Sequence, residues 1–73
     1  MAKSIKIDGE HITLGQFLKL TDVIQTGGMA KMFLQENEVF VNGEQETRRG
    51  RKLRNGDRID IPGFGSYTII QES

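Results

Sequence analysis

The N-terminal part of the chain alternates apolar and polar residues. Ile5 and Ile7 flank a single polar residue, a spacing typical of a strand that buries one face. The DGE sequence at 8–10 is a tight-turn signal, and HIT at 11–13 could form a returning strand. The pattern therefore predicts an N-terminal hairpin over residues 4–13.

The apolar spacing then changes to that of helices. Thr13 is a suitable N-cap for a helix over residues 14–20. TGG at 26–28 opens a second helix that runs to about Glu36, with Asn37 as its C-terminal stop. The apolar positions that repeat at the helical spacing are Leu14, Phe17 and Leu18 in the first helix and Ala30, Phe33 and Leu34 in the second.

After the second helix the period falls to two. Val39 and Val41 alternate, NG at 42–43 is a strong hairpin signal, and the polar EQE at 44–46 returns from it. Phe40 points away from its two valine neighbours if the strand alternates. We interpret Phe40 as a core residue of a second face, with an exposed aromatic ring available for stacking as the alternative.

Several short segments complete the chain. RNGD at 54–57 is a turn, RIDI at 58–61 a strand, PGFG at 62–65 a break, and residues 66–71 a final strand. A hairpin, two helices and then short strands indicate an α+β domain, with two short helices packed on a small antiparallel sheet. We expect residues 1–73 to form a single domain with one core.

Composition limits the classes of protein to which the chain can belong. With 73 residues, 36% hydrophobic and 27% charged, it has the composition of an ordinary globular domain too small for a second core. It has no cysteine, which excludes disulfides and thiolate metal sites. The first residues lack the apolar run of a signal peptide. We expect a cytoplasmic monomer that needs neither cofactor nor metal and contacts no membrane.

The charged residues are unevenly distributed, although the net charge is zero. Residues 48–58, here called the basic segment, hold six of the ten basic residues and one of the ten acidic residues. Such a segment either forms a solvated loop or attracts a polyanion. Most of its cations are arginines, whose planar guanidinium binds phosphate through two hydrogen bonds. The candidate phosphate-binding residues are Arg48, Arg49, Arg51, Lys52 and Arg54, next to Gly50, which allows close approach of the backbone.

The sequence contains few groups suited to catalysis. His11 is the only histidine, and no cysteine or serine-rich loop accompanies it, so we interpret it as a structural or surface residue. Glu44 and Glu46 could share one face of a strand as paired carboxylates, but we interpret them as solvated side chains. The sequence therefore predicts a protein that is not an enzyme.

The start of the second helix is a second candidate anion site. Gly27 and Gly28 could expose backbone N–H groups to a phosphate, and Lys31 follows one turn later. Taken alone, the two glycines favour close packing between the helices or a flexible turn, with the anion site as the alternative.

Three stretches of the chain together resemble the S4 RNA-binding domain family, over residues 12–61. They are ITLGQFLKL, TGGMAKMFLQENEVFVNGE and RKLRNGDRIDI. The short length and the expected N-terminal hairpin further resemble the small stand-alone S4-like proteins of bacteria. The residues that match the family pattern are Leu14, Phe17 and Leu18; Ala30, Lys31 and Leu34; Val39, Val41, Asn42 and Gly43; and Gly56, Asp57 and Ile59.

The resemblance implies an S4-like αL motif that binds structured RNA, with ribosomal RNA or a ribosomal particle as the partner. In the family, the start of the second helix and the neighbouring basic loop form the RNA surface. Thr13 and Gly27 stand where the family commonly has arginine, which moves the expected contacts to backbone amides and the loop. The implied RNA-binding residues are Gly27, Gly28, Lys31, Arg48, Arg49, Arg51, Lys52 and Arg54.

Two other functions remain open from the sequence. The opening IKIDGEHITLGQFLKL is also similar to that of β-grasp sulfur carriers, although this chain ends in IIQES rather than a reactive Gly-Gly. The basic segment could instead dock onto an acidic protein partner. Nuclease treatment of a pull-down separates that possibility from RNA binding.

Overall fold

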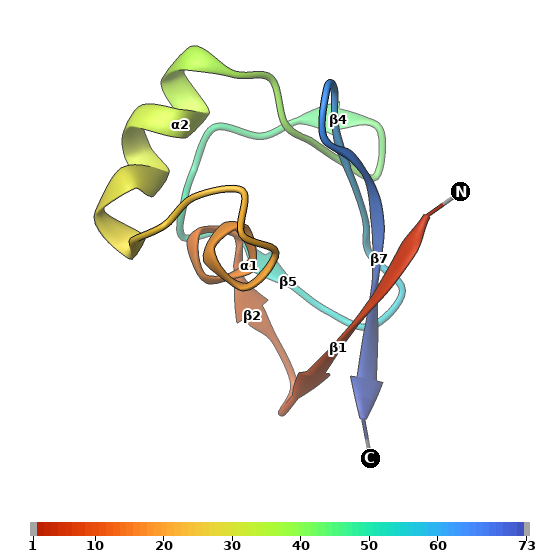
Figure 1. Cartoon of the computed structure of the whole chain (residues 1–73). Coiled ribbons are helices and arrows are strands. Elements are labelled where there is room, and N and C mark those ends of the chain that lie inside the picture. The colour runs from red at the N-terminus through yellow and green to blue at the C-terminus, as the bar shows by residue number, and fades with distance from the viewer. Residues whose placement is uncertain (1, 73) are drawn as a thin grey trace.

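Two short helices lie beside a five-stranded sheet in the computed structural model, which describes residues 2–72 (Figure 1). The helices are α1 (Leu14–Leu20) and α2 (Ala30–Glu36), and a 3₁₀ turn, η1 (Gly27–Met29), leads into α2. The strands are β1 (Lys3–Asp8), β2 (Ile12–Thr13), β3 (Phe40–Val41), β4 (Glu44–Gln45), β5 (Lys52–Leu53), β6 (Arg58–Ile61) and β7 (Gly65–Glu72).

The sheet is mixed, and the predicted N-terminal hairpin is wrong. The strand order is β1-β7-β6-β3-β4, while β2 and β5 form a separate antiparallel pair. Strand β1 runs parallel to β7, with Ile5 opposite Ile69, so the first and last strands lie side by side and the two termini lie at opposite ends of this pair (Figure 1). The two-residue β2 offers too short a ladder for β1, because α1 begins directly after Thr13, whereas β7 pairs with β1 over six residues. The predicted α+β class is confirmed, with a parallel pair added to the antiparallel strands.

Both predicted helices form, and the caps explain their ends. The Thr13 hydroxyl accepts a hydrogen bond from the Gln16 backbone N–H at 3.2 Å, and the Gln16 side chain accepts one from the Thr13 N–H at 3.0 Å. This capping box satisfies N–H groups that a helix start leaves without partners. Asn37 ends α2 by donating its backbone and side-chain N–H groups to the Phe33 carbonyl. No helix in residues 2–72 is long and apolar enough to cross a membrane.

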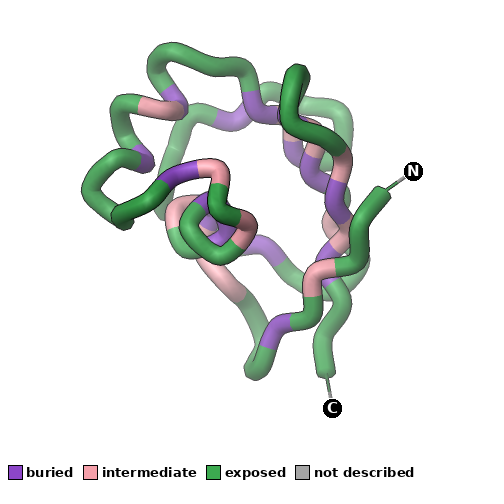
Figure 2. The backbone as a smooth tube through the Cα atoms, in the orientation of Figure 1, coloured by how far each residue is buried: buried purple, intermediate pink, exposed green. Residues whose placement is uncertain are grey.

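One core fills the space between the helices and the sheet (Figure 2). Phe17 of α1 packs edge-to-face on Tyr67 of β7, with ring centroids 5.2 Å apart, which joins the two layers. Phe40 is half-buried and lies outside the core cluster, so its interpretation as a core residue is wrong: it occupies the opposite face of β3 from Val41. The core consists of Ile7, Leu14, Phe17, Leu18, Ile24, Ala30, Leu34, Val39, Val41, Leu53, Ile59, Ile61, Tyr67 and Ile69.

Candidate nucleic-acid interface

Residues 47–51, here called the basic loop, are attached to the start of α1 through the backbone. The N–H groups of Leu14 and Gly15 donate to the carbonyls of Arg51 and Arg49, at 2.8 and 2.9 Å. The loop thus satisfies donors that the first turn of a helix leaves free. A Cβ on Gly15 would be in van der Waals contact with the Arg49 carbonyl oxygen at 3.4 Å and the Ala30 Cβ at 3.5 Å, so the loop and α2 both pack closely on the helix at this position. The most basic loop of the chain is therefore fixed to a helix.

Glu46 holds the other side of the basic loop, and its interpretation as a solvated side chain is wrong. It is only 8% exposed. Oε2 accepts hydrogen bonds from the backbone N–H groups of Thr47 and Arg48, at 3.1 and 3.0 Å, and from Arg48 Nε at 3.1 Å. Oε1 accepts from Arg48 Nη2 at 3.3 Å and Arg51 Nη1 at 3.2 Å. A carboxylate can be buried here because the loop that follows folds back to surround it with donors.

The electrostatics of this cluster favour the ionised carboxylate. The hydrogen bond from Arg48 is the largest cause that lowers the pKa of Glu46, to about 2, with burial acting in the opposite direction. The same pairing raises the pKa of Arg48. Glu44, two residues earlier, is exposed, as the sequence predicted for it.

The remaining cations of the basic segment divide into paired and unpaired groups. Arg58 Nε lies 3.3 Å from Asp60 Oδ1 on β6. Within residues 2–72, Arg49, Lys52 and Arg54 form no ion pair, and all three are exposed. These three side chains are consequently the ones most available to an anion from outside the molecule.

Two grooves meet at the basic loop and share Gly50. One, of about 440 Å³, lies between α1, η1 and the loop, and the other, of about 500 Å³, follows the loop into β5. The first groove is lined by Thr13, Gly15, Gln16, Lys19, Gly27, Ala30, Arg49 and Gly50. The second is lined by Arg48, Gly50, Arg51, Lys52 and Arg54.

The grooves bring together most of the site residues that the sequence predicted, and with them two polar side chains of α1. Gly27 faces the same groove as Arg49, whereas Gly28 and Lys31 line neither groove and are exposed. The helix start is short, with three residues in η1 and seven in α2, and anion binding there stays a prediction. Sequence reasoning missed Gln16 and Lys19. Their spacing of three residues on α1 could have revealed them, since it places both on one exposed face.

The NG and GD elements of the family pattern, at 42–43 and 56–57, stabilise the fold. Asn42 Nδ2 donates to Asp57 Oδ1 at 3.0 Å, and the Arg58 backbone N–H donates to Asn42 Oδ1 at 2.9 Å. Asp57 Oδ2 also accepts from the Arg54 N–H at 2.8 Å. Asn42 adopts a positive φ of 53°, which suits asparagine in a tight turn. The NG and GD elements therefore connect two turns, and the only acidic residue of the basic segment uses its carboxylate within this network.

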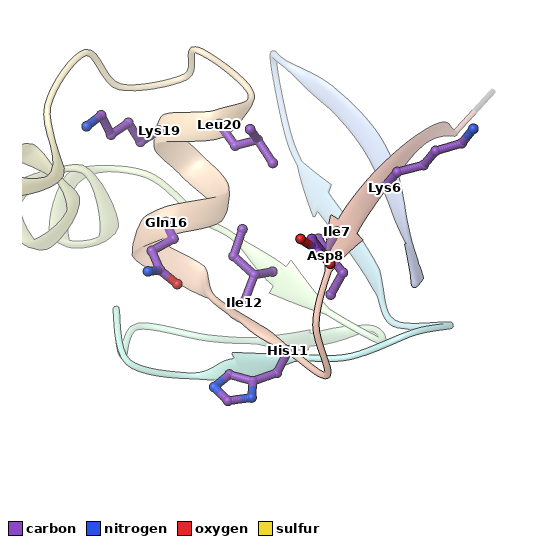
Figure 3. A pocket seen from close by; sticks show the side chains of 8 residues that line it. All are labelled: Lys6, Ile7, Asp8, His11, Ile12, Gln16, Lys19 and Leu20. Atoms are coloured by element: carbon purple, nitrogen blue, oxygen red, sulfur yellow. The ribbon is translucent and has the colours of Figure 1, made fainter. Parts of the chain in front are cut away.

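A third hollow, of about 680 Å³, lies between β1 and α1 (Figure 3). Leu20 and Ile12 point into it, and His11 lies at its rim, exposed to solvent as a surface residue. No group of three His, Cys, Asp or Glu side chains suited to a metal ion occurs within residues 2–72.

Comparison with known proteins places this geometry in a family. The family model of the S4 domain matches residues 5–70. The chain is 64% identical over 70 residues to the Bacillus subtilis protein named "Probable ribosome maturation protein RlbA", covering 96% of this chain and 99% of that protein. It is 30% identical over 59 residues to YbcJ of Escherichia coli, covering 81% of this chain and 84% of YbcJ. It is also 29% identical over 68 residues to the tyrosine–tRNA ligase of Serratia proteamaculans, covering 93% of this chain but 15% of that enzyme. The chain, with its arginine loop fixed to the first helix, belongs to the S4 domain family.

Proposed function

We propose that this protein is a non-enzymatic RNA-binding module that acts in ribosome maturation, and that it binds structured ribosomal RNA along the two grooves at the basic loop. The observation that carries the proposal is the row of unpaired cations, Arg49, Lys52 and Arg54, on a segment whose backbone is held in place. Cations that extend from a backbone held by hydrogen bonds suit the regularly spaced phosphates of an RNA helix.

The first groove supplies a second line of contacts beside this row. Lys19 adds a cation in the last turn of α1, and the Gln16 side chain retains its N–H donors while its oxygen caps the helix. Arg49 lines the first groove next to Gly50, which both grooves share, and its guanidinium can bind a phosphate or stack on an unpaired base there. We expect most contacts to go to the RNA backbone, so that shape rather than base sequence determines binding.

The name of the Bacillus subtilis relative supports the cellular role. That relative matches this chain along nearly the whole of both proteins and is named for ribosome maturation. Membership of the S4 family argues against the sulfur-carrier alternative, but docking of the basic segment onto an acidic protein remains a competing function.

Sedimentation with ribosomal particles tests the proposal. Tagged protein is expressed in its host, and the lysate is resolved on a sucrose gradient before and after digestion with ribonuclease. RNA binding predicts co-migration with ribosomal particles or their precursors, loss of that co-migration after digestion, and crosslinks to ribosomal RNA. Co-migration with a protein that survives complete digestion of the RNA would support the acidic-partner function instead.

A further inference from the structure

Glu46 occupies an unusual position for an acidic residue, since it is the buried centre of a surface that is otherwise basic. We infer that Glu46 is a positioning residue for RNA binding. It fixes Arg48, Arg51 and the loop backbone, so that the loop is already in its binding conformation when the neighbouring cations meet phosphates. This inference rests on the proposed RNA-binding function. Glu46 itself touches no RNA in this arrangement.

The hydrogen bonds show how completely the loop is held. Glu46 binds the N–H groups of Thr47 and Arg48 from one side, and α1 binds the carbonyls of Arg49 and Arg51 from the other. The Arg51 N–H also donates to the Arg48 carbonyl at 3.2 Å. Gly50 is then the residue of the loop whose backbone makes no hydrogen bond of this network.

The side chains within the network have separate tasks. Arg48 uses Nε and Nη2 on the carboxylate, and Arg51 uses Nη1. These contacts occupy two guanidiniums that would otherwise repel Arg49 and one another. Arg49 lies between them in sequence and points outward without an ion pair of its own.

An ordered loop improves binding because immobilising a long side chain opposes association. Each flexible arginine or lysine that must be fixed at an interface reduces affinity, and a loop fixed beforehand avoids that loss. A loop of like charges without Glu46 would also repel itself. The buried carboxylate thus offsets one positive charge of the surface and holds the backbone from which the neighbouring cations extend.

Charge and position make opposite predictions for the variant Glu46→Gln. If net charge alone governed affinity, the substitution would strengthen RNA binding, since it removes a negative charge and releases two arginines. If Glu46 positions the loop, the same substitution weakens binding although the protein becomes more positive. The direction of the change therefore separates the two explanations.

The experiment measures the affinity of a fluorescein-labelled RNA hairpin by fluorescence anisotropy at low salt. We expect Glu46→Gln to weaken binding by about 5- to 30-fold, the range set by releasing one or two long side chains. Glu44→Gln is the matched control: it removes the same charge from an exposed residue two positions away, and it should leave affinity unchanged or slightly increased. Glu46→Asp keeps the carboxylate and should recover part of the loss.

Two further measurements separate positioning from loss of stability. Amide hydrogen exchange at Thr47 and Arg48 should accelerate in Glu46→Gln, well before the core amides. Ile61→Val is a destabilising change in the buried part of β6. It should leave the affinity of the folded protein unchanged, even if it lowers the melting temperature as much as Glu46→Gln does.

The outcomes distinguish this inference from the proposed function. The positioning role would be overturned if Glu46→Gln bound RNA as tightly as the parent or more tightly, and Glu44→Gln changed the affinity in the same way. Weakening that Ile61→Val reproduces at equal loss of stability would also overturn it. If the parent protein itself failed to bind RNA, the proposed function would be refuted. The positioning role would then be refuted as well, even if amide exchange showed that Glu46 orders the loop.

Discussion

The buried carboxylate makes the stability of the fold depend on pH in a predictable window. The folded state lowers the pKa of Glu46 from 4.5 to about 2. A carboxylate with a depressed folded pKa stabilises the fold above its unfolded pKa, and that stabilisation is lost as the pH falls through the folded value. The contribution of Glu46 should therefore be complete above about pH 5 and should disappear between about pH 4.5 and 2.

The magnitude follows from the shift and from the exposure of the partners. Each pKa unit corresponds to about 1.4 kcal/mol, which gives an upper bound of about 3 kcal/mol for Glu46. The side chain of Arg48 is 74% exposed, so solvent screens part of this interaction and about 1–3 kcal/mol is a better expectation. Arg48 and Arg51 are the charged groups within ion-pair distance of Glu46.

Urea denaturation of the parent protein and of Glu46→Gln, from pH 7 to pH 2, measures the effect. The difference in the free energy of unfolding should be about 1–3 kcal/mol at pH 7 and should shrink towards zero near pH 2. Glu44→Gln should show no comparable dependence, because that side chain is exposed. A difference for Glu46→Gln that stays constant across the range would refute the reasoning, since it would not arise from the charge.

Three shorter predictions test the core, the contact between the basic loop and α1, and a surface residue expected to have no role in binding. Leu34→Ala should lower the free energy of unfolding by about 2–5 kcal/mol, measured by urea denaturation, because this side chain of α2 is 2% exposed in the core; a loss below about 1 kcal/mol would contradict that packing. Gly15→Val should destabilise the fold by about 1–3 kcal/mol and displace the basic loop, seen as shifted amide resonances at 49–51, since a Cβ already fills the space up to the Arg49 carbonyl at 3.4 Å and the two methyl groups of valine need more room. His11→Ala should leave RNA affinity unchanged in an anisotropy titration, and weakened binding by the folded variant would give this surface residue a role.

The helices could be predicted from the sequence because their signals are local. Apolar spacing and the Thr13 cap act within a few residues, so both helices form where the pattern placed them. Strand pairing is different, because it joins residues far apart in the chain. The alternation of Ile5 and Ile7 predicted a strand but carried no information about its partner, and the 65–72 strand rather than its neighbour pairs with it.

The interface could be predicted in composition but not in organisation. The basic segment was visible as a cluster of charge, and the structure assembles most of it along two grooves. The burial of Glu46 was hidden, since in an alternating polar stretch nothing distinguishes it from Glu44. Only the folding of the following loop back onto Glu46 supplies the donors that make burial possible.

The salt dependence of RNA binding tests the central claim most directly. If Arg49, Lys52 and Arg54 each meet a phosphate, the slope of log K against log salt should be about −2 to −3, at roughly 0.7–0.9 per contact. Arg49→Ala with Lys52→Ala should reduce the steepness by about 1.4–1.8 and weaken binding to all RNA sequences alike. Lys3→Ala with Lys6→Ala removes the same charge from β1 and should change the slope little. Equal effects of the two double variants, or no effect of the first, would contradict the placement of the RNA on the basic loop.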